Sequence, residues 1–185
     1  MRTSRLLLVV LTSVLAAACG PAKEPPPPAD PSVSSEVLAI RLASLPADFE
    51  VAVNDSRGLE LVPAEAKVGG RIVFAVGDEE PEVNLVAAVH RHQSQVEGMP
   101  GAEYKGGQEL LTPHGKAFYS RGRFLAGTDL VEETVVVLQH PASSRLLTIS
   151  YRYPAAGDSS VRVQQLLEIL GELEGTAGTA TAGSE

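Results

Sequence analysis

The sequence predicts an α+β domain, in which an antiparallel β-sheet packs against helices and a C-terminal amphipathic helix closes the chain. Between residues 116 and 153, three successive runs alternate apolar and polar residues with the period of a β-strand. Beyond residue 158, the apolar residues recur with the period of a helix. A helix that follows an antiparallel sheet is expected to lay its apolar stripe on one face of that sheet.

The chain begins with a segment that we exclude from the fold. Arg2 and Arg5 precede an apolar run at residues 6–15, and three alanines at 16–18 precede Cys19, the only cysteine. This order is typical of a secretory signal, and the run is shorter than the roughly 20 apolar residues that span a bilayer. An ordinary secretory signal is the alternative. A single thiol placed directly after the small residues favours a lipoprotein signal.

This segment resembles the signal peptides of bacterial lipoproteins. The resemblance implies a signal peptide at residues 1–18, cleavage between Ala18 and Cys19, and lipidation of Cys19. Each acyl methylene buried in the membrane stabilises the attachment by about 0.8 kcal/mol, so such an anchor is stable. Gly20 follows the cysteine, which in typical lipoproteins implies the outer membrane, with the protein facing the periplasm. The many prolines of the linker at 19–35 predict an extended spacer.

Charge limits the class of partner. The 185 residues hold 15 Lys and Arg against 23 Asp and Glu, and loss of residues 1–18 would remove Arg2 and Arg5 but no acid. The remaining net charge of -10 argues against a nucleic-acid partner, because polyanions are bound by a surplus of basic residues. The single cysteine rules out an internal disulfide, so stability must come from the buried core.

The folded domain is predicted at residues 36–174, and the Gly-, Thr- and Ala-rich stretch 175–185 is predicted to be a disordered tail. Residues 38–45 fit either a strand or a short helix. Further strands are predicted from period-two alternation, and they lie at 49–53, 59–62, 72–76 and 83–89.

The second half of the chain predicts a meander of three strands at 116–125, 131–138 and 147–153, with 108–111 leading into it. The run at 131–138 is apolar on both faces in its second half, as expected of a central strand. Asp158 is predicted to cap the final helix, and Gly175 to end it. The apolar stripe of that helix consists of Val163, Leu166, Leu167, Leu170 and Leu173.

The order of elements in residues 107–174 resembles the Mog/PsbP-like superfamily. A segment that starts at Gly107, the pattern of glycine, arginine and aromatic residues at 115–124, the strands at 131–138 and 145–151 and the final helix carry the resemblance. It implies an antiparallel sheet with helices on its faces. It also implies non-enzymatic work, such as binding a partner protein or stabilising an assembly, and no catalytic or metal-binding residue is carried over.

A metal site is a weaker hypothesis. His90 and His92 are two residues apart, so on the predicted strand their imidazoles would share a face, with His114 or His140 as a possible third ligand. Histidines before a polar segment are more often exposed surface residues. We therefore predict neither a metal nor any other cofactor.

Catalysis is not predicted. Ser120 and Ser143 have no recognisable base or oxyanion-hole motif nearby in the sequence. Glu132 and Glu133 are neighbours on a predicted strand, so their carboxylates should point to opposite faces.

A basic and aromatic patch is the candidate partner-binding surface. Its four residues, Tyr119, Arg121, Arg123 and Arg152, are predicted to lie on the polar face of the sheet. The alternative is ordinary cross-strand pairing of these arginines with Glu132 or Glu133. The sequence therefore favours a membrane-anchored lipoprotein with a binding or assembly domain for an envelope protein. A small-ligand or metal-binding envelope lipoprotein is the second hypothesis.

Overall fold

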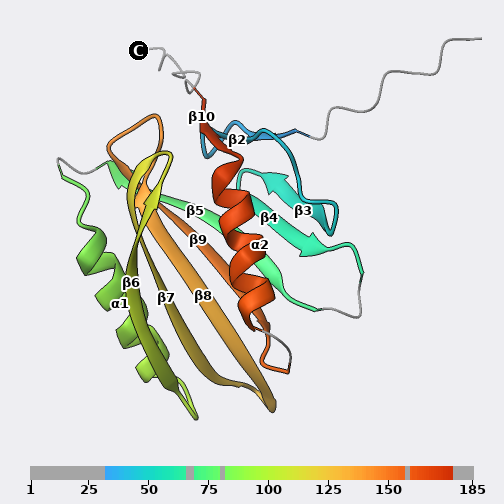
Figure 1. Cartoon of the computed structure of the whole chain (residues 1–185), viewed down its shortest axis with the longest axis vertical. Helices are drawn as coiled ribbons and strands as arrows, with labels where there is room; N and C mark the ends of the chain where they lie inside the picture. Colours follow the sequence, from blue (N-terminus) through green and yellow to red (C-terminus); the bar gives the residue numbers. More distant parts are fainter. Residues whose placement is uncertain (1–31, 66–68, 80–81, 157–158, 177–185) are drawn as a thin grey trace, which may run out of the picture. The chain divides into compact units, whose positions relative to one another are not determined.

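The computed structural model describes residues 32–65, 69–79, 82–156 and 159–176 (Figure 1). The predicted signal peptide, Cys19, most of the predicted linker and Asp158 lie outside these residues. The described part has an α+β fold with a large sheet, a small sheet and two helices. Neither of these two helices is long and apolar enough to cross a membrane.

The large sheet has seven strands in the order β3-β4-β5-β9-β8-β7-β6, and every neighbouring pair is antiparallel. The strands are β3 (Phe49–Asp55), β4 (Gly58–Pro63), β5 (Arg71–Glu79), β6 (Glu103–Thr112), β7 (Gly115–Ala126), β8 (Asp129–Gln139) and β9 (Arg145–Pro154). The predicted meander is confirmed, because β8 pairs with both β7 and β9. The pairing of β5 with β9 joins the two halves of the chain into one sheet.

The strand predicted at residues 83–89 is wrong, because this segment opens the helix α1 (Leu85–Glu97). The side-chain oxygen of Asn84 accepts a hydrogen bond from Ala87 N at 2.9 Å and so caps the first turn. A run with apolar residues on both sides fits a buried strand and the start of a helix equally well, so alternation could not decide. The buried residues of α1 recur at every fourth position: Ala88, His92 and Val96.

The predicted final helix is present as α2 (Ser159–Gly171), but it ends earlier than expected. The following strand β10 (Leu173–Gly175) pairs with β2 (Ile40–Leu42), which also pairs with β1 (Val33–Ser35). This small sheet takes in three residues of the predicted linker and the first residue of the predicted tail. Strand pairing therefore extends the folded domain beyond both predicted boundaries.

The two helices lie on opposite faces of the large sheet (Figure 1). Alternate residues of β8 show this, since Val136 and Leu138 belong to the main core under α2, whereas Val135 and Val137 pack with Ala88 of α1. The α2 residues in the main core are Leu166, Ile169 and Leu170. On the other face, α1 contacts β6, β7 and β8. It does not cover the residues of β9 on that face, which line a groove.

Candidate binding site

Two adjacent glutamates on β8 organise the polar contacts of the sheet. Glu132 lies on the α2 face and Glu133 on the α1 face, as predicted from strand geometry. Each carboxylate contacts basic or histidine side chains from neighbouring strands or from α1. We call these clusters the Glu132 network (Glu132, Arg121, Arg123, Tyr153) and the Glu133 network (Glu133, Arg152, His92, Ser120).

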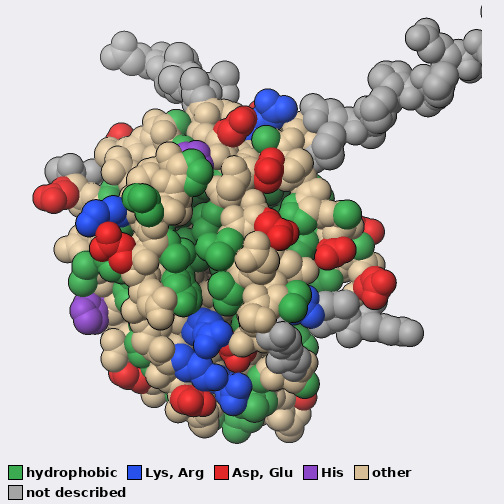
Figure 2. Space-filling model, in the orientation of Figure 1, with side chains coloured by type: hydrophobic (Ala, Val, Ile, Leu, Met, Phe, Trp, Pro, Cys, Tyr) green, Lys and Arg blue, Asp and Glu red, His purple; other side chains and the backbone are tan. Residues whose placement is uncertain are grey.

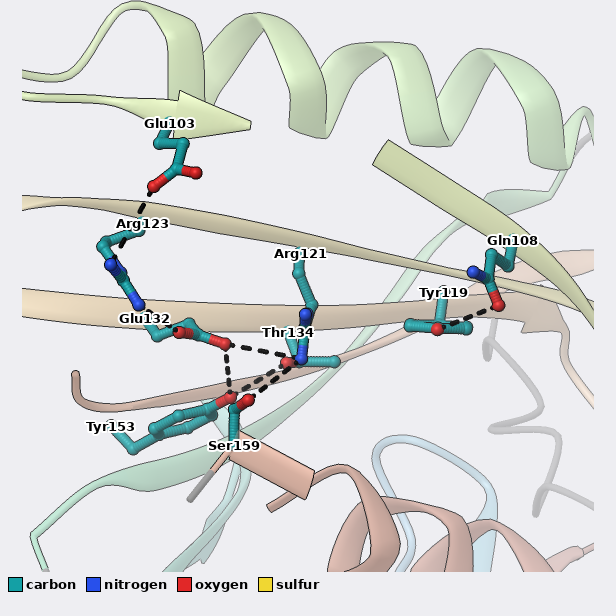
Figure 3. Close-up of polar contacts among 9 residues, drawn as sticks. All are labelled: Glu103, Gln108, Tyr119, Arg121, Arg123, Glu132, Thr134, Tyr153 and Ser159. Atoms are coloured by element: carbon teal, nitrogen blue, oxygen red, sulfur yellow. Dashed lines mark hydrogen bonds and ion pairs between the residues drawn. The ribbon is translucent and has the colours of Figure 1, made fainter. Parts of the chain in front are cut away.

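The Glu132 network is almost closed to solvent, because the Glu132 side chain is only 2% exposed. Its carboxylate accepts a hydrogen bond from Tyr153 Oη at 3.1 Å and lies 3.7 Å from Arg121 Nη1 and 3.5 Å from Arg123 Nη2 (Figure 3). The two arginines come from β7, where they flank the carboxylate on one face. This geometry compensates a buried negative charge with two half-buried positive charges.

Burial and the neighbouring Glu132 carboxylate raise the pKa of Tyr153 to about 12. The phenol therefore stays neutral at physiological pH and acts as a hydrogen-bond donor to the carboxylate. Arg121 also donates to Ser159 Oγ at 3.2 Å, which connects the network to the first residue of α2 (Figure 3). The network thus fixes the start of α2 against the sheet.

The surface of the α2 face combines an apolar hollow with a basic region (Figure 2). Hydrophobic side chains gather beside α2 over β7 and β8, and Lys or Arg side chains gather towards the end of the sheet where α2 begins. Tyr119 lies on this face, where it packs against the main core and donates to Gln108 Oε1 at 3.0 Å. The polar groups of this face are therefore mostly engaged with one another.

The Glu133 network lies on the opposite face and is more open. Arg152 donates to Glu133 Oε1 from Nη2 at 2.9 Å and from Nε at 3.2 Å, and His92 Nε2 lies 3.5 Å from Oε2. Burial alone would raise the pKa of Glu133, but the contacts with His92 and Arg152 outweigh it and hold the pKa below its usual value. Glu133 is therefore a fixed negative charge.

His92 is held from both sides. Its Nδ1 lies 2.6 Å from Ser120 Oγ, and its side chain is only 5% exposed. Tyr104 meets the imidazole edge-on, with 6.2 Å between the ring centroids. Arg152 also lies 5.4 Å above the Phe124 ring, in the geometry of a cation–π contact. Arg152 and His92 are therefore both held by contacts to neighbouring side chains.

A groove of about 530 Å³ lies between α1 and the sheet, with the Glu133 network at one end. Its walls are about half apolar and half polar, and the polar side chains come from β9, β8 and α1. A concave site of this size with a few convergent polar groups is typical of ligand-binding pockets. Its lining includes Arg91, Val135, Val137, Thr148, Ser150 and Arg152.

The predicted patch requires a correction, because the structure does not bring its four residues together. Tyr119, Arg121 and Arg123 lie on the α2 face, but Arg152 lies on the α1 face and lines the groove. Arg152 and Arg121 occupy positions of opposite parity in the paired register of β7, β8 and β9, so their side chains diverge. The alternative of cross-strand pairing with Glu132 and Glu133 describes these arginines better.

The shared face expected for His90 and His92 is also wrong, because both lie on α1. Residues two apart on a helix diverge by about 200°, so His92 is buried while His90 is exposed. His140 donates from Nε2 to Leu38 O at 2.8 Å and accepts from Ala142 N at Nδ1, which occupies both ring nitrogens. Within the described ranges, no three His, Cys, Asp or Glu side chains are placed to hold a metal ion.

The imidazole beside Ser120 was not predicted from the sequence. His92 lies 28 positions away and reaches Ser120 only through the packing of α1 on β7. The available signal was Asn84 as a helix cap, followed by buried residues at every fourth position. Ser120 is 1% exposed and does not line the groove, so this contact positions the imidazole and does not present a nucleophile.

Comparison with known proteins shows the fold. No family model and no curated protein matches the sequence. Among solved structures, LpqN of Mycobacterium tuberculosis, involved in cell envelope biogenesis, aligns at 15% identity and a TM-score of 0.54, over 75% of this chain and 83% of LpqN. The Ran-binding protein Mog1p of Saccharomyces cerevisiae aligns at 13% identity and 0.55, over 77% of this chain and 93% of Mog1p.

The cyanobacterial PsbP protein CyanoP of Synechocystis sp. PCC 6803 aligns at 11% identity and a TM-score of 0.55. The alignment covers 86% of this chain and 98% of CyanoP. Identities this low establish shared architecture and nothing about shared partners. The seven-stranded antiparallel sheet with helices on its two faces is the Mog1/PsbP-like α+β fold.

Proposed function

We propose that the protein is a bacterial lipoprotein, anchored through Cys19 in the outer membrane and facing the periplasm, whose domain binds another envelope protein without catalysis. The N-terminal sequence supports the anchor, and the fold shared with LpqN, involved in cell envelope biogenesis, is consistent with the location. The groove beside α1 is the observation that carries the binding role, because it is a preformed concave site with one open side.

The groove has an exposed apolar edge that suits a protein partner. Met99 follows the end of α1, lines the groove and is 39% exposed. Its backbone N donates to Val96 O at 2.9 Å, which holds this edge against the end of α1. Apolar side chains exposed next to a concave site are typical of interaction surfaces.

The geometry also supports a non-enzymatic role. The pair of Ser120 and His92 is closed to solvent at the serine, and Glu132 and Glu133 are held by arginines. A nucleophile needs access to substrate and a general base needs a proton to take from it. Neither condition is met in these two networks.

Binding of a small ligand is the second candidate function, and the groove favours it as well, because its volume suits a small molecule. The metal-binding version of this hypothesis loses its basis, since His90 and His92 do not share a face. A protein partner should depend on the exposed apolar edge at Met99, whereas a small ligand should depend on the charged and hydroxyl side chains of the groove.

The anchor is tested by expressing the full chain and the Cys19→Ala variant in a Gram-negative host and separating membrane from soluble fractions. We expect the unaltered protein in the outer-membrane fraction with a lipid-modified N-terminal cysteine by mass spectrometry, and the variant in the soluble fraction. Retention of the variant in the membrane, together with an unmodified wild-type cysteine, would exclude the lipid anchor.

The binding role is tested by cross-linking in intact envelopes of its own species. Met99→Ser should abolish the cross-linked species, because it places a polar group in the exposed apolar edge of the groove. Val51→Ser on β3 is the matched control, since Val51 is 40% exposed on a distant strand. Equal cross-linking by wild type and both variants would show that this edge does not bind the partner.

A further inference from the structure

The floor of the groove has an ordered row of hydrogen-bond donors. Thr148, Ser150 and Arg152 alternate along β9, so their side chains point into the groove at intervals of about 7 Å. Opposite them on β8 lie Val135 and Val137, which make the other half of the floor apolar. One edge of a bound molecule would thus meet donors, and the other edge would meet methyl groups.

The charges around the groove favour an anion. Arg91 and Arg152 carry two positive charges against the one negative charge of Glu133, so the charged side chains of the lining sum to +1 with His92 neutral. This local surplus is unusual in a chain whose net charge is -8. Attraction to an anion is stronger in such a half-enclosed site than on the open surface.

The donors of the groove are available to a ligand. Arg152 uses Nε and Nη2 on Glu133, and its Nη1 makes no hydrogen bond to the described residues. Arg91, Thr148 and Ser150 likewise donate no side-chain hydrogen bond within the described part of the chain, and all three line the groove. The guanidinium of Arg152 is therefore held in a fixed position with one end still free.

The buried imidazole of His92 adds a fixed donor at the polar end. Its Nε2 is buried without a hydrogen-bond partner among the described residues, although Glu133 Oε2 lies 3.5 Å away. The nearby carboxylate favours the proton on Nε2, and the Ser120 hydroxyl then donates to Nδ1. A buried polar group left without a good partner is costly, which makes a further acceptor at this point favourable.

We infer that the groove binds an organic monocarboxylate with a compact apolar body. The carboxylate lies against Arg152 and Arg91, the apolar body lies over Val135 and Val137, and Ser150 and Thr148 donate to acceptors along its other edge. A single negative charge balances the net charge of the lining, and a planar carboxylate matches a guanidinium. This inference rests on the proposed binding role but not on the lipid anchor.

A carboxylate of this kind has two sources, the C-terminal end of a peptide and a free small acid. The probes are N-acetyl-Ala-Val-Val and 4-phenylbutanoate, each compared with its carboxamide. They are titrated into the full chain, labelled with ¹⁵N and held in detergent, while the amide signals of α1 and β9 are followed by NMR. We expect saturable shifts with at least one acid and about tenfold weaker binding of its amide.

Variants locate the site. Arg91→Gln should weaken binding at least about threefold and should fold normally, because Arg91 is exposed on α1. Thr148→Phe should fill the groove and prevent binding. Arg57→Gln is the matched control and should change nothing, since Arg57 pairs with Asp55 in the turn between β3 and β4.

The two sources give different results. Binding of the peptide acid alone assigns the groove to a polypeptide end, and binding of 4-phenylbutanoate alone assigns it to a small acid. Equal binding of acids and amides, or no shift with any probe, would overturn the inference. If Thr148→Phe also abolishes the cross-linked partner while no carboxylate binds, the binding role stands and only the assigned ligand class is wrong.

Discussion

Glu132 and Glu133 are identical side chains in adjacent positions, yet the sheet gives them different environments. Glu132 is 2% exposed on the α2 face, and Glu133 is 14% exposed at the end of a groove. Glu132 forms ion pairs with Arg121 and Arg123 of β7, whereas Glu133 pairs with one arginine of β9 and lies beside a histidine of α1. The covering helix, and not the strand, decides whether a carboxylate is sealed or accessible.

The two helices differ in what they cover. The main core under α2 reaches from β4 and β5 across β9 to β8, and so closes the polar network of that face. The smaller cluster under α1 includes residues of β7, β8 and β9 but leaves the groove beside it. One face therefore stabilises the fold, and the other combines stability with a site that can receive a ligand.

The largest expected effect is the loss of the Glu132 carboxylate. Glu132→Gln should lower the free energy of unfolding by about 2 to 3 kcal/mol, because Arg121 loses its carboxylate partner and Arg123 keeps only Glu103, at 3.9 Å. This is below the value for a fully buried pair, since Arg121 and Arg123 are 28% and 33% exposed. Urea unfolding followed by circular dichroism measures the change.

Glu133→Gln is the matched variant for the more open face. It should lower the free energy of unfolding by about 1 kcal/mol or less, because Arg152 is 40% exposed and can turn towards water. A cost equal to that of Glu132→Gln would contradict the distinction between a sealed and an open face.

A second, smaller effect concerns how closely α1 approaches the sheet. A Cβ at Gly122 of β7 would lie 2.5 Å from Val96 Cγ2 of α1. Gly122→Ala should therefore force the helix outward and lower the free energy of unfolding by about 2 kcal/mol. Val96→Ala should relieve part of this cost in the double variant, which a double-mutant cycle measures.

Gly77→Ala is the control for this substitution, because a Cβ there would lie 3.6 Å from Leu146 Cβ, an ordinary contact. It should leave stability nearly unchanged. If Gly122→Ala were equally harmless, the close packing of α1 on β7 would be wrong.

The smallest expected effect is on the pH dependence of stability, which should differ between the two faces of the sheet. The folded pKa of Glu133 lies below its value in the unfolded chain, so its contribution is present above pH 4.5 and is lost as the pH falls through the folded pKa. Glu133→Gln should therefore reduce the acid-induced loss of stability below pH 4.5. Unfolding midpoints at pH 7 and pH 3.5 measure this difference, and an unchanged acid dependence would contradict it.

On the other face, Tyr153 should make the stability of the fold depend on pH in the alkaline range. Its pKa rises from 10 in the unfolded chain to about 12 in the fold, so stability is lost as the pH rises from 10 to 12. Ultraviolet titration of the phenolate should show a late step near pH 12 that Tyr153→Phe removes. A step near pH 10 for all tyrosines would show that Tyr153 is not buried beside Glu132.

The strands were predictable because their signal is local. Alternation along residues 116–153 needs only the period of a strand, and turn residues separate the runs. The opposite orientation of Glu132 and Glu133 follows from the same geometry. The strand predicted at residues 83–89 was wrong because a run with apolar residues on both sides fits a strand and the first turn of a helix equally well. Only packing against β6, β7 and β8 selects the helix α1.

The sequence by itself determined the order of the strands of the meander, the final helix and the features around Cys19 that predict a lipid anchor. The tertiary structure decided which residues meet across the sheet. It brought His92 to Ser120, placed Arg152 on the opposite face from Arg121, and formed the groove between α1 and β9. Periodicity depends on neighbours in the chain, whereas these contacts depend on strand order and on the helix that covers each face.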